Sequence, residues 1–144
     1  KKLNFDYLQL YDVSPKKTKV IKKKFKIKII TAITVKNLKD VLKYKNFVNI
    51  SEIILFDSKG YEKSLGFNHQ LLKNVTHPIN KMLAGNIKYN DKLDKYEKIT
   101  DIIDISGSLE TRGEKDNLKI DKFLRNIKKV NDKDKKKNSA NRSA

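Results

Sequence analysis

The chain contains no cysteine and no tryptophan, and only two prolines and five glycines interrupt its 144 residues. Without cysteine, a disulfide framework and a thiolate metal site are both excluded. The two histidines, His69 and His77, do not have the spacing of a paired metal site, and zinc would need two further ligands. We therefore expect no metal and no cofactor.

Local motifs for the common kinds of catalysis are also missing. The five glycines form neither a phosphate loop nor a dinucleotide-binding pattern, and Ser106-Gly107-Ser108 lacks the preceding glycine of a nucleophile elbow. Alternation along residues 99 to 110 places Asp101 and Asp104 on opposite faces of a predicted strand. Two such carboxylates could not flank one bond or share one metal. The sequence thus predicts a protein that is not an enzyme.

Long hydrophobic runs are absent as well. No apolar stretch approaches the roughly 18 residues that a membrane-spanning helix requires, so we expect no membrane span. The chain begins at Lys1 rather than at methionine, which is compatible with a removed segment. A cytoplasmic or assembly-associated location is favoured, and the composition is also compatible with secretion.

Negative charge is scarce. The chain has 34 lysines and arginines but only 17 acidic residues, which gives a formal net charge of +17. Residues 16 to 28 carry eight lysines and no acid, and residues 128 to 144 carry a net +5. Such blocks favour a polyanionic partner such as nucleic acid. The alternative is that the lysines are solvated and reflect codon supply, because arginine, which binds phosphate bidentately, occurs only at Arg112, Arg125 and Arg142.

Alternating apolar and polar residues predict the strands. The clearest strand covers residues 20 to 35, where Phe25 and Ile27 share one face and Lys24, Lys26 and Lys28 the other. Further strands are predicted for residues 3 to 13, 50 to 56 and 99 to 110. A turn at residues 57 to 60 would join the second of these to a hairpin partner at residues 61 to 67.

Helical spacing predicts fewer elements. Residues 36 to 46 form a short helix with Asn37 as its N-cap, and residues 117 to 130 form an amphipathic helix. A short helix is also predicted at residues 80 to 84, within a loop-rich stretch from 68 to 98. The fold class is α+β: one domain over residues 1 to 130, with a mainly antiparallel sheet of about five strands and two or three helices on one face. Residues 131 to 144 are predicted to be a disordered lysine-rich tail.

Two groups of residues are candidates for binding. The lysines of residues 24 to 28 would lie about 7 Å apart on one strand face, close to phosphate spacing. Together with basic residues on the C-terminal helix, they make up the predicted polyanion-binding set: Lys22, Lys24, Lys26, Lys28, Lys122, Arg125 and Lys129. The second group is the run Ile103, Ile105, Gly107 and Leu109, which presents a strand edge for assembly.

This second run is followed by Gly113 and by an amphipathic helix over residues 118 to 127. The pattern resembles the small tail-completion and baseplate proteins of contractile phage-type tails. The resemblance covers residues 99 to 127 and implies a virion structural protein whose strand pairs with neighbouring subunits.

The leading functional hypothesis is therefore a non-catalytic structural or interaction subunit of a larger assembly, with other protein subunits, including itself, as partners. The first alternative is a sequence-nonspecific nucleic-acid or ribonucleoprotein-binding protein that uses residues 22 to 28 and the tail. The second alternative is a surface or secreted domain from an AT-rich organism.

Overall fold

The computed structural model describes residues 4–58 and 66–140. The chain divides into two compact units, the first comprising residues 1–86 and 99–104 and the second residues 87–98 and 105–144. Each unit is described by itself. Among the described residues, no helix combines the length and the apolar character needed to cross a membrane.

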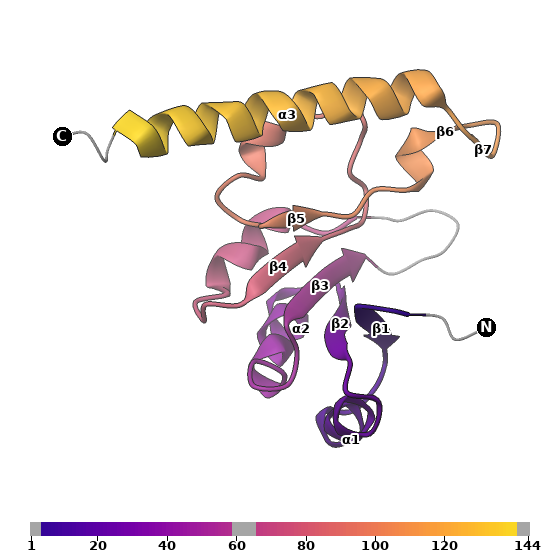
Figure 1. The fold of residues 1–144 in the computed structure, drawn as a ribbon, viewed down its shortest axis with the longest axis vertical. Helices are drawn as coiled ribbons and strands as arrows, with labels where there is room; N and C mark the ends of the chain where they lie inside the picture. Colours follow the sequence, from indigo (N-terminus) through magenta and orange to yellow (C-terminus); the bar gives the residue numbers. More distant parts are fainter. Residues whose placement is uncertain (1–3, 59–65, 141–144) are drawn as a thin grey trace. The chain divides into compact units, whose positions relative to one another are not determined.

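The first unit is built on a five-stranded sheet in the order β1-β2-β3-β4-β5. The strands are β1 (Tyr7–Tyr11), β2 (Lys28–Val35), β3 (Ile53–Ser58), β4 (Asn80–Leu83) and β5 (Ile102–Ile103). All four strand pairs are parallel, and the strands lie side by side in Figure 1. The predicted antiparallel sheet is therefore wrong. After each strand the chain crosses back to the opposite edge of the sheet, so that every strand runs in the same direction.

Helical segments occupy the connections between the strands. They are α1 (Pro15–Phe25), α2 (Leu38–Leu42) with the 3₁₀ turn η1 (Lys43–Asn46), and η2 (His69–Asn74). The predicted strand over residues 20 to 35 is thus a helix end followed by a strand. The predicted short helix at residues 80 to 84 is instead β4. The predicted hairpin partner at residues 61 to 67 lies largely outside the described residues.

Helix α1 begins with a clear local signal. Ser14 is its N-cap and accepts a hydrogen bond from the Lys17 N–H, and Pro15 stands in the first turn, where its missing N–H has no cost. The helix ends at Lys26, which has a left-handed backbone conformation (φ 49°). Lys24 and Lys28 therefore belong to different elements, so Lys24, Lys26 and Lys28 do not share a strand face.

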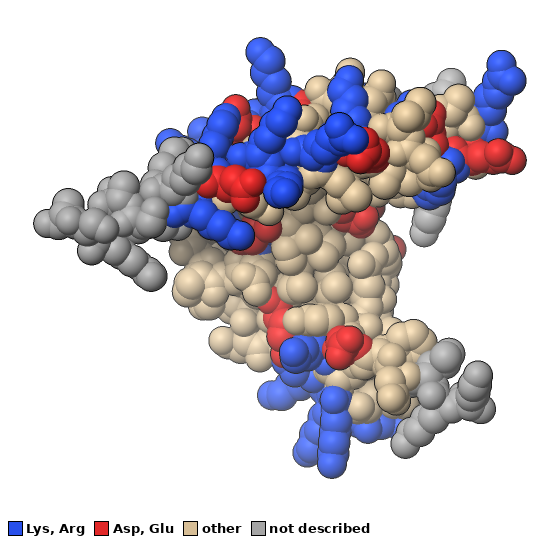
Figure 2. Space-filling model, turned by 45° about the horizontal axis from the view of Figure 1, so that its top comes forward, with Lys and Arg blue, Asp and Glu red and all other residues tan. Residues whose placement is uncertain are grey.

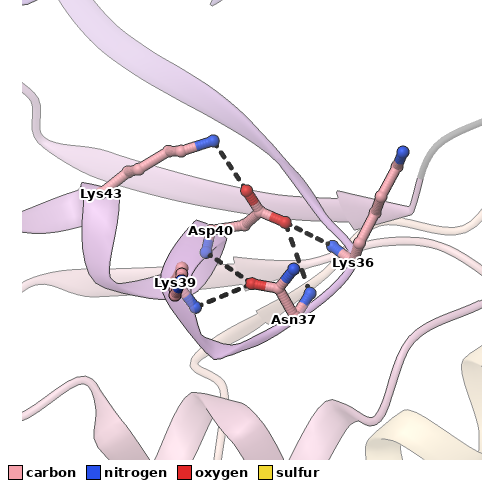
Figure 3. Close-up of polar contacts among 5 residues, drawn as sticks. All are labelled: Lys36, Asn37, Lys39, Asp40 and Lys43. Carbon is pink, nitrogen blue, oxygen red and sulfur yellow. Dashed lines mark hydrogen bonds and ion pairs between the residues drawn. The ribbon is translucent and has the colours of Figure 1, made fainter.

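Helix α2 confirms the predicted N-cap at Asn37. The Asn37 side chain accepts hydrogen bonds from the N–H groups of Lys39 and Asp40, and the Asp40 carboxylate accepts one from the Asn37 N–H (Figure 3). This reciprocal pair is a capping box. A hydrogen bond from Lys43, 2.7 Å away, and further ones from the Lys36 and Asn37 N–H groups outweigh partial burial and lower the pKa of Asp40.

The two faces of the sheet are both apolar. On one face, side chains of β2, β3 and β4 are almost fully inaccessible to solvent; they are Ile29, Val35, Ile54, Phe56 and Leu83. On the other face, which we call the inner face, Ala32, Leu55 and Ala84 form a buried cluster with Ile30 and Met82 packed against it. Burial on both faces is what allows parallel strands to be nearly continuous apolar runs.

An ion pair joins α1 to the start of β3. The Lys22 ammonium lies 2.5 Å from Glu52 Oε1 and donates to the Ile50 carbonyl, while Glu52 Oε2 accepts from the Ile29 N–H at 2.7 Å. Partial burial alone would raise the pKa of Glu52, but the hydrogen bonds from Lys22 and Ile29 lower it. Glu52 therefore stabilises the folded state at pH values above the ordinary carboxyl pKa. This stability is lost as the pH falls through the lowered folded-state pKa.

We predict that Glu52→Gln lowers the free energy of unfolding at pH 7 by about 1 kcal/mol, because Lys22 loses its charged acceptor. Urea unfolding at several pH values measures this, and the difference from the unmodified chain should disappear as the carboxyl is protonated. Glu114→Gln, which changes an exposed acid in the second unit, is the matched control and should have no effect. Equal losses in both variants would contradict the prediction.

The second unit contains η3 (Leu93–Lys95), η4 (Gly107–Leu109), the antiparallel pair β6 (Glu110–Thr111) and β7 (Glu114–Lys115), and α3 (Asn117–Ala140). The predicted helix over residues 117 to 130 is confirmed, and it continues to Ala140. Residues 131–140 are thus helical and do not form the predicted disordered tail. Lys and Arg side chains gather over α3 in Figure 2.

Candidate active site

The carboxyl ends of the five parallel strands all lie at one edge of the sheet. In α/β sheets ligands bind at this edge, because the loops that follow the strands carry the polar side chains. The residues at the edge are Tyr11 at the end of β1, Asp57 near the end of β3, Gly85 after β4 and Asp104 directly after β5. All four belong to the first unit.

Register places three of these side chains on the inner face. Tyr11 pairs with Ala32, Ala32 pairs with Leu55, and Asp57 stands two residues beyond Leu55. Asp104 stands two residues beyond Ile102, which pairs with Met82 on the inner face. The sheet therefore presents a phenol and two carboxyl groups above a buried apolar cluster.

Asp57 contacts Tyr11 and acts electrostatically on Asp104. The Tyr11 hydroxyl donates a hydrogen bond to Asp57 Oδ2 at 3.2 Å. Asp104 remains accessible to solvent, but the partial burial of its carboxyl group and, after that, the negative charge of Asp57 raise its pKa. A carboxyl group with a raised pKa beside a second carboxyl group can act as the acid of an acid–base pair.

The raised pKa of Asp104 gives a prediction for stability. The folded state binds the Asp104 proton more tightly than the unfolded state does, so stability falls as the pH rises from the unfolded-state pKa through the folded-state pKa. We expect Asp104→Asn to raise the free energy of unfolding at pH 7 by on the order of 0.5 kcal/mol, and to have no effect at low pH. Urea unfolding at both pH values measures this.

Asp6→Asn is the control for this prediction, since Asp6 is an exposed acid that precedes β1. It should leave the stability unchanged at both pH values. A loss of stability at pH 7 in Asp104→Asn would show that the carboxylate makes a favourable contact there, which would contradict the prediction.

The loop after β4 brings backbone close to the same edge. Gly85 has a positive φ (86°), and an added Cβ would lie 2.8 Å from the Ser58 nitrogen of β3. The Gly85 carbonyl oxygen lies 3.0 Å from Nε2 of His69, and the His69 ring meets the edge of the Phe67 ring. The structure thus uses His69 to hold this loop, a role that its position in the sequence did not indicate.

The predicted polyanion-binding residues are largely engaged within the chain. Lys22 is paired with Glu52, Lys24 lies 5.5 Å from the centre of the Phe25 ring, and Lys28 lies 5.2 Å from that of Tyr7. The remaining members are Lys26 at the end of α1 and, on α3, Lys122 over Tyr89, Arg125 paired with Asp121, and exposed Lys129. Polyanion binding by this set stays an untested prediction.

The predicted assembly edge does not form one strand. Ile103 ends β5, whereas Gly107 and Leu109 belong to the 3₁₀ turn η4 and Ile105 lies between the two elements. The expected strand glycine is thus the first residue of a turn. Among the described residues, no group of three or more His, Cys, Asp or Glu side chains could hold a metal ion.

The comparisons with known proteins agree with the parallel topology. The family model described as N-(5'-phosphoribosyl)anthranilate (PRA) isomerase matches residues 1–126. No curated protein matches this chain. A crystal structure of phosphoribosylanthranilate isomerase from Thermotoga maritima is similar, with a TM-score of 0.69 and 22% sequence identity over 85% of this chain and 62% of that one.

A second crystal structure, of mutually generated monomers of the dimeric isomerase from Thermotoga maritima, has a TM-score of 0.62 and 18% identity over 85% of this chain and 71% of that one. These likenesses indicate a fold of the TIM-barrel type with parallel strands. This chain spans about three fifths of the first structure's length.

These findings correct the functional predictions. The resemblance to phage-tail proteins is wrong, because the matched family and both similar structures are isomerases. The prediction of a non-catalytic structural subunit with protein partners is wrong for the same reason, since the family consists of enzymes that act on a small molecule. The nucleic-acid-binding alternative and the surface-domain alternative are likewise not supported by any of the matches.

Proposed function

Because this chain belongs to the phosphoribosylanthranilate isomerase family, whose model matches residues 1–126, we propose that it carries the proton-transfer groups of that isomerase at the carboxyl edge of its sheet. The observation that supports the proposal is the neighbouring pair Asp57 and Asp104 on the inner face. In TIM-barrel enzymes, side chains at the carboxyl ends of the strands perform the catalysis. The proposed substrate is N-(5'-phosphoribosyl)anthranilate.

An isomerisation leaves the composition of the substrate unchanged, so the enzyme must return every proton that it takes. This requires one group that donates a proton and one that accepts a proton, each within hydrogen-bond reach of the substrate. Asp104, whose pKa is raised by the partial burial of its carboxyl group and by the charge of Asp57, is the proposed proton donor. Asp57, on the central strand of the sheet, is the proposed proton acceptor.

The loop that follows β4 supports binding of a phosphorylated substrate. Gly85 and Asn86 follow β4 and both have a positive φ (86° and 55°), so the chain turns sharply beside the strand end. In TIM-barrel enzymes, loops at this edge commonly bind phosphate through their backbone N–H groups. We propose that this loop faces the 5'-phosphate.

The experiment is a turnover assay with N-(5'-phosphoribosyl)anthranilate. The expected result is loss of the substrate and appearance of a product of identical mass, separated by chromatography and detected by mass spectrometry. The matched substrate lacking the 5'-phosphate should be turned over much more slowly. Absence of turnover and absence of substrate binding in a folded protein would overturn the proposal.

A further inference from the structure

We propose that Tyr11 is a positioning residue for Asp57. The inference rests on the proposed function of Asp57, and it concerns a side chain from a different strand. Tyr11 ends the edge strand β1, and Asp57 lies near the end of β3, with β2 between them. The Tyr11 hydroxyl nonetheless reaches Asp57 Oδ2 at 3.2 Å.

The contact depends on small side chains in the intervening strand. Neighbouring strands lie about 4.8 Å apart, so side chains on β1 and β3 are separated by about 10 Å at their bases. On the inner face of β2, the residues between them are Ala32, which pairs with Tyr11, and Thr34, which pairs with Asp57. A larger residue at position 32 would occupy the space that the Tyr11 ring crosses.

A second hydrogen bond fixes the direction of the first. Gln9, two residues earlier on the same face of β1, has its Nε2 3.4 Å from the Tyr11 hydroxyl oxygen. Since an amide nitrogen can only donate, the Tyr11 oxygen is the acceptor there and its hydrogen is directed to Asp57. Gln9 therefore donates a hydrogen bond to Tyr11, and Tyr11 donates one to Asp57.

The consequence for Asp57 is a fixed carboxylate plane. Tyr11 occupies Oδ2, and Oδ1 is then the oxygen that exchanges a proton with the substrate. A carboxylate held by a donor keeps one orientation, and a proton acceptor works only when it is within hydrogen-bond reach in the correct geometry. Tyr11 thus acts on turnover through Asp57 and does not itself exchange a proton.

The test compares Tyr11→Phe with Tyr7→Phe. Tyr7 lies on the same face of the same strand and is similarly exposed (39% against 41%), so it is a matched control. We expect Tyr11→Phe to lower kcat on the order of tenfold with KM changed less than twofold, which is the scale of one lost hydrogen bond to a charged group. Tyr7→Phe should leave both constants unchanged. An unchanged kcat in Tyr11→Phe would overturn the proposal.

A double-mutant cycle separates this proposal from the proposed function. The unfolding equilibrium constants of Tyr11→Phe, Asp57→Ala and the double variant should be non-additive by roughly threefold to tenfold. If the two substitutions are non-additive but the protein has no isomerase activity, the Tyr11–Asp57 contact is supported and the proposed function is refuted. Additive effects would refute the contact whether or not the protein is an isomerase.

Discussion

Asp57→Asn is expected to lower isomerase turnover by about 10²- to 10⁴-fold, the usual contribution of a general acid or base. Asparagine keeps the shape of the side chain and still accepts the Tyr11 hydrogen bond, so the fold should be unchanged. It cannot accept a proton, so the chemical step loses its base while substrate binding is retained. Steady-state kinetics should show a fall in kcat, with KM within a few-fold of its original value.

Asp101→Asn is the control for this variant, because Asp101 lies next to the same sheet at the amino end of β5. Its Oδ2 accepts a hydrogen bond from the Lys81 N–H at 2.8 Å, which asparagine can also accept. Turnover in Asp101→Asn should therefore equal that of the unmodified chain. Full activity in Asp57→Asn would show that Asp57 does not transfer a proton and that other residues do.

The sequence was informative wherever one local signal decided the structure. Asn37 precedes a short helix and was predicted as its N-cap; the structure confirms this cap and adds the reciprocal hydrogen bond from the Asn37 N–H to Asp40. The stripe of Ile120, Phe123 and Ile127 likewise predicted α3. In these cases the side chains that define the element lie within one or two turns of each other, so tertiary contacts were not needed to recognise it.

Helix α1 was not predicted from the sequence, because its composition hides the 3.6-residue spacing of apolar residues that marks a helix. Most of its positions are lysine, and Val20 and Phe25 are exposed, so an apolar stripe with helical spacing is almost absent. The signal that could have identified it is Ser14 followed by Pro15, an N-cap with proline in the first turn. The predicted strand over residues 3 to 13 ends just before this pair, and no helix start was predicted there.

Missing α1 also led to the wrong sheet. With two strands joined directly, an antiparallel hairpin is the natural expectation, whereas a helix between them permits a parallel pair. The buried run from Ile53 to Phe56 carries no alternation, which is typical of a parallel strand covered on both faces. Asp57, predicted as the first residue of a turn, is instead the fifth residue of this strand and a site residue.

Gly85→Ala is expected to lower the free energy of unfolding by about 3 kcal/mol and to weaken turnover as well. Two costs add at this position. A non-glycine residue in the left-handed region costs about 1–2 kcal/mol, and the new Cβ would lie 2.8 Å from the Ser58 nitrogen. The Ser58 side chain is also in the way, but the contact with the backbone nitrogen can be relieved only by moving β3 or the loop, and β3 carries Asp57.

Two other glycines separate these costs. Gly113 also has a positive φ (84°) but no atom within 4 Å of an added Cβ, so Gly113→Ala should cost only about 1–2 kcal/mol. Gly107 has neither feature, so Gly107→Ala should stay within about 0.5 kcal/mol of the unmodified chain. Urea unfolding of the three variants should therefore order them Gly85, Gly113, Gly107 by loss of stability. If Gly85→Ala lost no more than Gly113→Ala, the loop after β4 would be free to move away from Ser58, and it could not hold the substrate's phosphate in a fixed place.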